Sequence, residues 1–413
     1  MLTFREARSL IIDQLANLAP PRSPEPVALG DAHGRVLSAA VRADRDYPPF
    51  DRSTRDGYAV RAAEATSGAR LSCVGEIKAG DTPPSFLAPN SCLHIMTGAA
   101  VPAGADAVVM IEHTTREADS VLFTRASRPG QNIVLRGNEG RIGQIALPAG
   151  ARLGYAELAA AAQVGATQLL CAPRPRIAIL STGDEIVAVS ETPGPFQIRN
   201  SNAISLAAQV RTAGAELVLL GNAADRESDL RAKISQGLQH DALILSGGVS
   251  MGKYDLVEKV LREMSAEFFF DSVAIRPGKP TVFAICASKP IFGLPGNPVS
   301  TMVTFELFVI PAIDILSGAV PRPLPLTHAI LAADLNEKPG MTHFLPAKIE
   351  WPSTPEGAER RTIPPGQVRA LHWQSSGDIA VMAQANCLLV VPAETEHVPA
   401  GTPVSILLRK DVV

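Results

Sequence analysis

The stretch from Arg176 to about Gly318 constrains the fold most, because short aliphatic runs mostly alternate in it with longer amphipathic ones. The strand-like runs are 177–180, 217–220, 242–245, 282–285 and 290–292, and the helix-like runs are 201–212, 227–238, 254–264 and 299–316. Such alternation predicts parallel strands joined by crossover helices. We therefore expect a three-layer α/β/α domain over residues 176–319.

Four loops rich in glycine, proline and polar residues accompany the expected strands. They are Ser181–Glu185, Ser246–Gly252, Arg276–Pro280 and Gly293–Pro298, and each is taken to follow a strand. Ligands of parallel α/β sheets bind outside the carboxyl ends of the strands. The four loops are therefore expected to face one crevice.

The residue types in these loops suit a phosphorylated anion held together with a divalent metal. Glycines permit close backbone approach, and a helix expected after Asn297 would present its positive end. Arg276 and Lys279 add full positive charge, and carboxylate oxygens are the ligands that Mg²⁺ prefers. A single such loop is usually only a turn, and a lone acid such as Asp184 is usually a solvated residue or a helix cap. Four loops at one edge favour the ligand site.

Residues Gly247–Lys253 also match the G-x-x-x-x-G-K pattern of a phosphate-binding P-loop. That pattern requires Ser or Thr next, to hold Mg²⁺, and this chain has Tyr254. The loop also comes late in the domain rather than after its first strand. The P-loop interpretation is therefore disfavoured.

The amino-acid composition restricts the classes of function that the protein can have and the cellular compartment in which we expect it. There are 38 Lys and Arg against 41 Asp and Glu, a net charge of −3, whereas a nucleic-acid-coating surface should be visibly basic. The 5 cysteines form no CxxC pair, the N-terminus lacks a signal-peptide pattern, and no run approaches a membrane span of about 18 apolar residues. We expect a cytoplasmic protein that contacts neither nucleic acid nor membrane.

The 413 residues predict two to four domains. A helix begins at a Thr3–Glu6 capping box, with Ala7, Leu10, Ile11 and Leu15 at helical spacing. The expected domains are a helical linking domain (1–46 and 140–175), a small β domain (47–139), the α/β domain (176–319) and, after an extended linker at 320–325, a C-terminal β domain (320–413).

The loop motifs, in this order and with Asp255, closely resemble the molybdopterin molybdenumtransferase family of the MoeA and gephyrin E-domain type. Two first-half motifs resemble it as well: Phe50–Val60, and Ile95–Pro102 leading to Gly104–Val109. The resemblance runs from the first helix to the C-terminal β domain, and six motifs in the family's order make it specific.

The resemblance implies an elongated four-domain subunit in a homodimer, with the active cleft between the α/β domain of one subunit and the small β domain of the other. It implies Mg²⁺ as the metal, with adenylylated molybdopterin and molybdate as substrates. AMP leaves, and molybdenum passes to the dithiolene sulfurs. Two further partners are compatible with it, namely the adenylyltransferase of the same pathway and apo-molybdoenzymes.

Matched by position, the resemblance implies three sets of site residues. The catalytic set is Asp56, Thr97, Glu139, Glu185, Asp225, Asp255 and Lys279. The binding set is Arg136, Thr182, Gly183, Asp184, Ser246, Gly247, Gly248, Ser250, Arg276, Gly278, Gly296, Asn297 and Pro298. The metal ligands would be Glu185, Asp225 and Asp255. Alone, each acid would be interpreted as a loop residue or a cap.

The sequence departs from the family pattern in four places. Arg52–Arg55 stands where Asn-Ser-Ala-Met is usual, Asn138-Glu139 replaces Glu-Asp, Arg276 stands where Lys is common, and Gly340–Phe344 replaces an Arg and Phe pattern. Because of the last departure, no function of the family is assigned to the C-terminal domain. Its expected role is structural or partner-binding.

Three other functions stay open. A molybdopterin adenylyltransferase would share only residues 176–318, so the first half favours molybdenum insertion. A gephyrin-like scaffold without catalysis would not need the Asp, Glu and Lys positions. A generic nucleotide-binding regulator is the third. The preference between molybdate and tungstate and the identity of the recipient apo-enzymes are not determined by the sequence.

Overall fold

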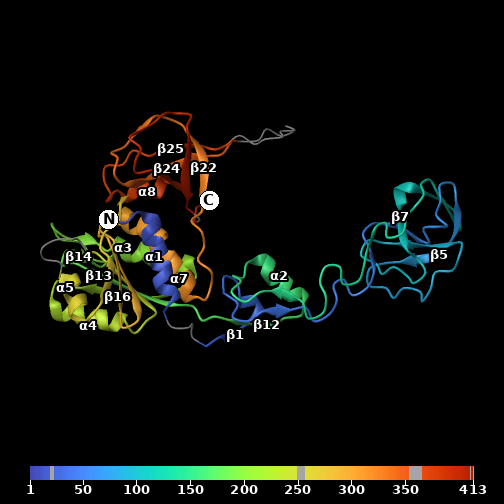
Figure 1. The fold of residues 1–413 in the computed structure, drawn as a ribbon, viewed down its shortest axis with the longest axis horizontal. Helices are drawn as coiled ribbons and strands as arrows, with labels where there is room; N and C mark the ends of the chain where they lie inside the picture. The colour runs from blue at the N-terminus through green and yellow to red at the C-terminus, as the bar shows by residue number, and fades with distance from the viewer. Residues whose placement is uncertain (19–22, 249–255, 353–364, 410, 413) are drawn as a thin grey trace. The chain divides into compact units, whose positions relative to one another are not determined.

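The computed structural model describes residues 1–18, 23–248, 256–352, 365–409 and 411–412 (Figure 1). Two compact units divide the chain: residues 26–33 with 39–170, and residues 1–25 with 34–38 and 171–413. The expected grouping of 1–46 with 140–175 differs from this division at the first helix, which belongs to the unit of the C-terminal half. The four domain boundaries remain a prediction.

The first helix, α1 (Phe4–Ala16), begins at the predicted capping box. The Thr3 hydroxyl accepts from the Glu6 backbone N–H at 3.3 Å, and the Glu6 carboxylate accepts from the Thr3 backbone N–H at 2.8 Å. Its buried face is Phe4, Ala7, Ile11 and Leu15. These side chains join the core that covers one face of the central sheet.

The central sheet has six strands in the order β16-β13-β17-β21-β20-β18. They are β13 (Arg176–Thr182), β16 (Glu216–Ala223), β17 (Ala242–Ser246), β18 (Glu267–Phe270), β20 (Val282–Cys286) and β21 (Lys289–Leu294). Strands β16, β13, β17 and β21 run parallel to one another, as the alternation predicts.

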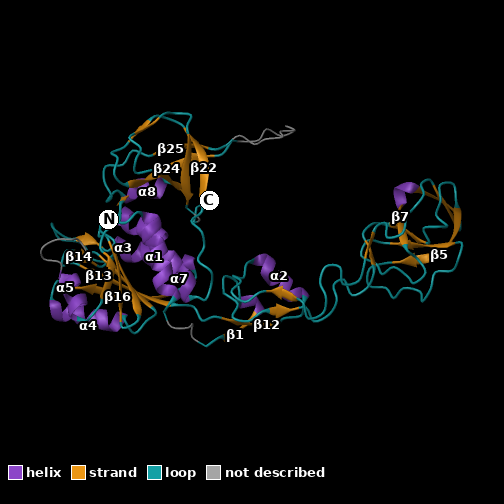
Figure 2. Ribbon diagram, viewed as in Figure 1, coloured by secondary structure: helices purple, strands orange, loops and turns teal. Residues whose placement is uncertain are grey.

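Helices cover both faces of this sheet, which confirms the three-layer domain (Figure 2). Because side chains alternate along a strand, Ile177 and Ile179 enter one core while Ala178 and Leu180 enter the other. The first core is covered by α1, α3 (Ser201–Ala213), α6 (Pro298–Thr304), a π-helical turn (Phe305–Val309) and α7 (Ile310–Leu316), and the second by α4 (Glu227–Gly237) and α5 (Leu256–Glu263). The expected start of α5 at 254–255 lies outside the described residues.

The helix Pro298–Leu316 is the one described segment long and apolar enough to cross a membrane, and 72% of it is buried inside the protein. Its apolar side chains are therefore those of a core helix.

Strand β20 departs from the predicted parallel arrangement, because it runs antiparallel to both of its neighbours. Strands β20 and β21 form a hairpin whose two connecting residues, Ala287 and Ser288, have φ of 49° and 60°. Two consecutive positive φ values suit such a hairpin. The usual Asn-Gly signal is missing from Ala-Ser, and the sequence therefore does not indicate this reversal.

The C-terminal part of the same unit is a β structure that closes on itself, because β24 pairs with both β25 and β26. Its elements are β22 (Leu326–Leu331), β23 (Leu335–Asn336), β24 (Thr342–Glu350), β25 (Gln367–Ala370), α8 (Ile379–Gln384), β26 (Cys387–Val391), β27 (His397–Val398) and β28 (Pro403–Leu408). A short strand from the α/β half, β19 (Ile275–Arg276), pairs parallel with β24. The segment just before Lys279 is thereby attached to the C-terminal domain.

The other unit contains the predicted small β domain, a six-stranded sheet in the order β7-β4-β6-β5-β9-β8. Its strands are β4 (Gly57–Val60), β5 (Arg70–Ile77), β6 (Ser91–Ile95), β7 (Ala107–Met110), β8 (Thr114–Glu117) and β9 (Ser120–Phe123), with the short pair β3 (Arg52–Ser53) and β10 (Ile133–Val134) beside it. Further elements that lie wholly or mostly in this unit are β1 (Glu25–Ala28), β2 (Val41–Arg42), β11 (Ile145–Leu147), α2 (Tyr155–Gln163) and β12 (Gln168–Cys171).

Candidate functional site

The carboxyl ends of the parallel strands meet at one edge of the central sheet, as predicted. Thr182 at the end of β13 is in register with Ala223 of β16, and Ser246 at the end of β17 is in register with Leu294 of β21. Asn297 and Pro298 begin α6 beyond β21. Three of the four predicted loops therefore lie together because their strands end together.

The fourth loop, Arg276–Pro280, lies at the same edge. It lies between β18 and β20, and β18, which is antiparallel to β20, runs in the same direction as β21. Because β20 is antiparallel, its first residue, Val282, is in register with Gly293 near the end of β21. Lys279 therefore lies at the predicted edge, between the end of β18 and the start of β20.

The glycines at this edge permit a close approach between β13 and the loop after β17. A Cβ added to Gly247, where φ is +90°, would lie 2.8 Å from the Thr182 carbonyl oxygen, and one added to Gly248 would lie 2.6 Å from the Thr182 hydroxyl. That hydroxyl is buried and has no hydrogen-bond partner among the described residues. A polar group buried in this way is a candidate ligand contact.

Two acids lie side by side where β13 and β16 end. The Asp225 backbone N–H donates to the Asp184 carboxylate at 3.2 Å, and Asn222 donates to the Gly183 carbonyl at 2.8 Å. Glu185 is exposed on the same loop. Ser250 and Asp255, two further predicted site residues, lie outside the described residues. The described ranges hold no preassembled group of three acid, histidine or cysteine side chains around a metal position.

Three asparagines support this edge, and the sequence analysis missed all of them. Asn202, on α3, donates to the Ser246 hydroxyl at 3.0 Å and to the Gly296 carbonyl at 2.8 Å, so it ties two of the loops together. Asn200 caps α3 and donates to Ser181, while Asn222 holds the Gly183 loop. The run Asn200-Ser201-Asn202 before a helix-like segment was a visible capping signal.

Lys279 lines a cavity of about 320 Å³ that both halves of its unit build. The walls of this Lys279 cavity are the Arg276–Pro280 loop with Ile275, Pro295, Asn297 and Ser300 from the α/β half, and Met341, Trp373, Ser375 and Ser376 from the C-terminal half. A Cβ on Gly278, where φ is +111°, would lie 2.5 Å from the Thr304 methyl carbon, so the loop packs tightly on α6. The C-terminal domain supplies four of the wall residues, and its expected structural or partner-binding role remains a prediction.

The C-terminal domain also contacts Arg276. One guanidinium nitrogen of Arg276 lies 3.9 Å from the Glu337 carboxylate, and the buried His343 ring nitrogen Nδ1 lies 2.8 Å from that carboxylate. The other nitrogen of His343 lies 3.0 Å from the Lys338 carbonyl oxygen. His343 belongs to a segment that departs from the family pattern, and here its ring lies beside the acid that faces Arg276.

In the small β domain, Asp56 and Thr97 are brought together across 41 residues of sequence. One carboxylate oxygen of Asp56 accepts from the Thr97 backbone N–H at 2.7 Å and from its hydroxyl at 2.8 Å. The backbone hydrogen bond first, and the hydroxyl second, lower the pKa of Asp56 below its ordinary value. Both residues are exposed, so the Asp56 carboxylate lies at the surface of its unit.

Two of the departures from the family pattern contact each other. A guanidinium nitrogen of Arg52 donates to the Glu139 carboxylate at 2.5 Å. Arg136, another predicted site residue, pairs with Asp46 at 2.9 Å, and its backbone N–H donates to Asp51 at 2.7 Å. The charge of Glu139 is thus balanced by an arginine that the usual family motif lacks.

Three family models together match most of the chain. The MoeA N-terminal region (domain I and II) matches residues 2–165, the "Probable molybdopterin binding domain" matches 178–314, and the MoeA C-terminal region (domain IV) matches 328–408. Fold and matched models define a multidomain transferase built around a molybdopterin-binding α/β domain.

Full-length relatives identify the family. A molybdopterin molybdenumtransferase of Nostoc is 34% identical, with 98% of this chain and 94% of the relative covered, and one of Staphylococcus aureus is 30% identical, with 99% and 96% covered. A solved molybdopterin biosynthesis MoeA protein of Pyrococcus horikoshii is 27% identical with a TM-score of 0.80, covering 99% of this chain and 100% of that one. This chain belongs to the MoeA family of molybdopterin molybdenumtransferases, which are transferases of molybdenum cofactor biosynthesis.

Proposed function

We propose that this protein transfers molybdenum from molybdate to adenylylated molybdopterin, with Mg²⁺-dependent release of AMP. The observation that carries the proposal is the Lys279 cavity, whose wall includes the cationic side chains of Lys279 and Arg276. This cavity lies at the same edge of the central sheet as the loops that contain Thr182, Gly247 and Gly296. Family membership supports the reaction class, and the cavity supplies a place for an oxyanion.

Charge explains why cations and a metal are both needed. The dithiolene, the pyrophosphate bridge and molybdate are all anionic, so their mutual repulsion must be offset before they can react. Lys279 and Arg276 provide fixed positive charge. Asp184 and Asp225 would repel the substrate unless a cation lies between the acids and the phosphates.

Glu185, Asp225 and Asp255 are the proposed ligands of Mg²⁺ or of its waters. The ends of two adjacent strands supply carboxylate oxygens, which are the type of ligand that Mg²⁺ prefers. When bound, the metal would neutralise charge at the phosphoanhydride. The proposed anchors of the pterin and phosphates are Thr182, Gly183, Asp184, Ser246, Gly247, Gly248, Ser250, Arg276, Gly278, Gly296, Asn297 and Pro298.

We further propose that the active cleft is composite, with Asp56, Thr97, Arg136 and Glu139 acting from a second subunit. The proposal is supported by the exposed, hydrogen-bonded Asp56 carboxylate, which requires a partner surface in order to act on substrate. A cytoplasmic location, apo-molybdoenzymes as recipients and contact with the preceding adenylyltransferase remain predictions.

The test of the function is to incubate the purified protein with adenylylated molybdopterin, molybdate and Mg²⁺, and then to add an apo-molybdoenzyme. Release of AMP with activation of the apo-enzyme supports insertion. In a parallel incubation with ATP and molybdopterin, an adenylyltransferase would instead form pyrophosphate, and a scaffold or nucleotide-binding regulator would do neither. The last two results would refute the proposal.

Assembly gives a first prediction. The composite cleft requires a two-fold homodimer, so light scattering at micromolar concentration should give twice the subunit mass of 43.5 kDa. Co-expressed Asp56→Ala and Lys279→Ala subunits should recover part of the activity, because a mixed dimer retains one intact cleft. A monomeric mass, or mixed dimers as inactive as either parent, would contradict the composite cleft.

The metal gives a second prediction. Asp225→Asn should lower AMP release at limiting Mg²⁺ by about tenfold or more while substrate binding changes less, because the metal acts mainly as charge develops in the reaction. Asp271→Asn, an exposed acid elsewhere in the domain, is the matched control. Wild-type Mg²⁺ dependence of the Asp225 variant would remove Asp225 from the ligand set.

The Asp56–Thr97 contact gives a prediction on pH. Thr97→Val removes the hydroxyl that helps to lower the pKa of Asp56, so that pKa should rise toward its ordinary value. If Asp56 acts ionised, the acid limb of the pH–rate profile should move to higher pH. Thr115→Val, an exposed threonine of β8, should leave the profile unchanged. A shift to lower pH, or none, would contradict the role of Asp56.

A further inference from the structure

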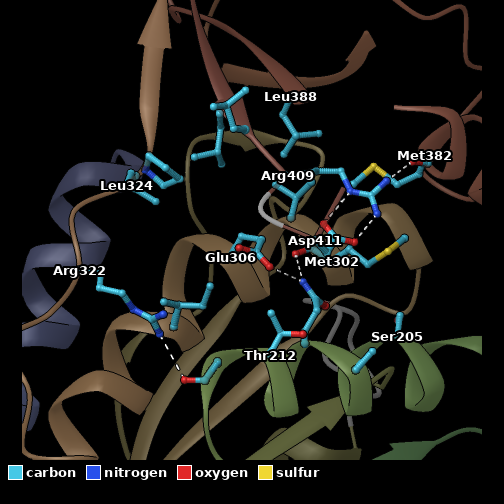
Figure 3. A pocket seen from close by; sticks show the side chains of 18 of the residues that line it. Ser205, Thr212, Met302, Glu306, Arg322, Leu324, Met382, Leu388, Arg409 and Asp411 are labelled. Carbon is cyan, nitrogen blue, oxygen red and sulfur yellow. Dashed lines mark hydrogen bonds and ion pairs between the residues drawn. The ribbon is translucent and has the colours of Figure 1, made fainter. Parts of the chain in front are cut away.

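The C-terminal domain meets the α/β half of its unit at two places, and the arginines at these places are paired differently. Beside α3 and the helix 298–316, a cavity of about 280 Å³ has Arg322 and Arg409 in its wall (Figure 3). Arg409 donates to the Met382 carbonyl at 2.8 Å, and Arg322 lies 2.8 Å from the buried Asp314 carboxylate. Both guanidinium groups are therefore engaged within the protein.

Arg276, at the second place, is paired much less tightly. Its side chain is 51% exposed, and its guanidinium has a single charged partner among the described residues, the Glu337 carboxylate at 3.9 Å. That distance is too long for a hydrogen bond. An exposed ion pair of this kind is weak, so the charge of Arg276 is available to a ligand.

Arg276 belongs to the walls of two neighbouring cavities. Together with Trp373, it lines the Lys279 cavity and also a cavity of about 380 Å³. Glu337 belongs to the wall of the larger cavity and not to the described wall of the Lys279 cavity. The Glu337 carboxylate can therefore affect an oxyanion in the Lys279 cavity through Arg276, without touching the oxyanion itself.

Two strand pairings bring the acid and a histidine to Arg276. Strand β19 pairs parallel with β24, which places Arg276 in register with His343. Strand β23, which ends at Asn336 just before Glu337, pairs with β27. The Glu337 backbone N–H also donates to the Glu396 carbonyl at 2.9 Å. These backbone contacts hold the arginine, the acid and the histidine at one place.

The contacts of His343 assign one proton to its pair with Glu337. The ring nitrogen Nε2 lies 3.0 Å from the Lys338 carbonyl oxygen, which can only accept, so Nε2 carries a hydrogen. The other ring nitrogen, Nδ1, lies 2.8 Å from the Glu337 carboxylate. Two lone pairs would repel each other at that distance, so a proton lies between these atoms. Whichever atom the proton is bonded to, the pair has no net charge.

We propose that the Glu337–His343 pair determines how strongly Arg276 attracts an oxyanion in the Lys279 cavity. Glu337 is a positioning residue whose carboxylate competes with the oxyanion for the guanidinium group. His343 weakens this competition, because it offsets the charge of the carboxylate. The inference rests on the proposed function, since it takes the Lys279 cavity as the oxyanion site.

Calorimetric titration of the full-length protein with sodium molybdate tests the pair. Glu337→Gln removes the competing charge, so molybdate should bind about threefold more tightly than to the wild type. His343→Asn leaves the carboxylate without its partner, so molybdate should bind about threefold more weakly. Glu350→Gln, the same change at an exposed position of β24, is the control and should bind as the wild type does. Damage to the fold would weaken binding in both variants of the pair, whereas the proposal requires opposite effects.

A double variant shows whether Glu337 acts through Arg276. In an Arg276→Gln protein, Glu337→Gln should no longer tighten binding, because the group on which the carboxylate acts is missing. Thermal melts identify a misfolded His343→Asn protein, and the Glu337→Gln result then still decides the matter.

The outcomes separate this inference from the proposed function. Molybdate binding that depends on Lys279 but is not tightened by Glu337→Gln, or is tightened equally without Arg276, would refute the role of the pair alone. No binding by the wild type, or wild-type affinity of Lys279→Ala, would refute the oxyanion site and this inference with it.

Discussion

Replacing Lys279 with alanine should reduce molybdate-dependent AMP release by about 100-fold at subsaturating molybdate, because it removes a fixed charge from the wall of a site that gathers anions. The loop around it is held in place. The Lys279 carbonyl accepts from the Val273 and Thr281 backbone N–H groups at 3.0 and 2.9 Å, and Gly278 packs against α6. The side chain itself is exposed, so the thermal melt should be nearly unchanged.

Three further variants sharpen this prediction. Lys279→Arg should rescue only in part, since a forked guanidinium places its donors differently from an ammonium. Arg276→Lys should be milder than either, because lysine keeps the positive charge at that position. Lys348→Ala, an exposed lysine of β24, is the control and should behave as wild type. If Lys279→Ala keeps wild-type dependence on molybdate, the Lys279 cavity is not the oxyanion site.

Gly57→Ala should cause the largest loss of stability, about 3 kcal/mol or more, which corresponds to a fall in Tm of roughly 10 °C. Gly57 follows Asp56 and begins β4, between β6 and β7. A Cβ there would lie 1.9 Å from the carbonyl oxygen of Val109 and 2.8 Å from its carbonyl carbon. Both are backbone atoms, so the strands must separate.

The matched control is Gly30→Ala in the same unit, where an added Cβ meets no described atom within 4 Å. Neither glycine has the positive φ that would add strain, so the difference between the two melts isolates the steric effect. Equal melting temperatures for the two variants would contradict the close pairing of β4 with β7. A loss in the Gly57 variant should also displace Asp56 and lower activity.

Periodicity and capping chemistry predicted much of the fold, because those signals are local. The Thr3–Glu6 box marks the start of α1, and the strands β13, β16 and β17 follow from short apolar runs between helix-like segments. The direction of β20 could not be predicted. It depends on two positive φ angles at Ala287 and Ser288, residue types that do not signal such a turn.

The parts of the candidate site that lie within one loop or motif could be predicted from the sequence, whereas the parts formed where distant segments meet could not. The loops at the sheet edge follow from their motifs, and Asp56 and Thr97 were each named from a motif, but their contact across 41 residues was not predicted. The Trp373 and Ser376 wall of the Lys279 cavity comes from nearly 100 residues later in the chain and has no local signal. The Arg52–Glu139 contact joins two noted departures that are 87 residues apart, and only the folded chain shows that one balances the other.

The central claim is that cleavage of the phosphoanhydride is coupled to molybdenum insertion at the Lys279 edge of the sheet. A single-turnover reaction of the wild-type protein with adenylylated molybdopterin and Mg²⁺ tests it most directly, with AMP and active cofactor counted at each molybdate concentration. We predict that AMP appears only when molybdate is present, in equal amount to the active cofactor formed. AMP release at the same rate without molybdate, or AMP release without active cofactor, would contradict the claim.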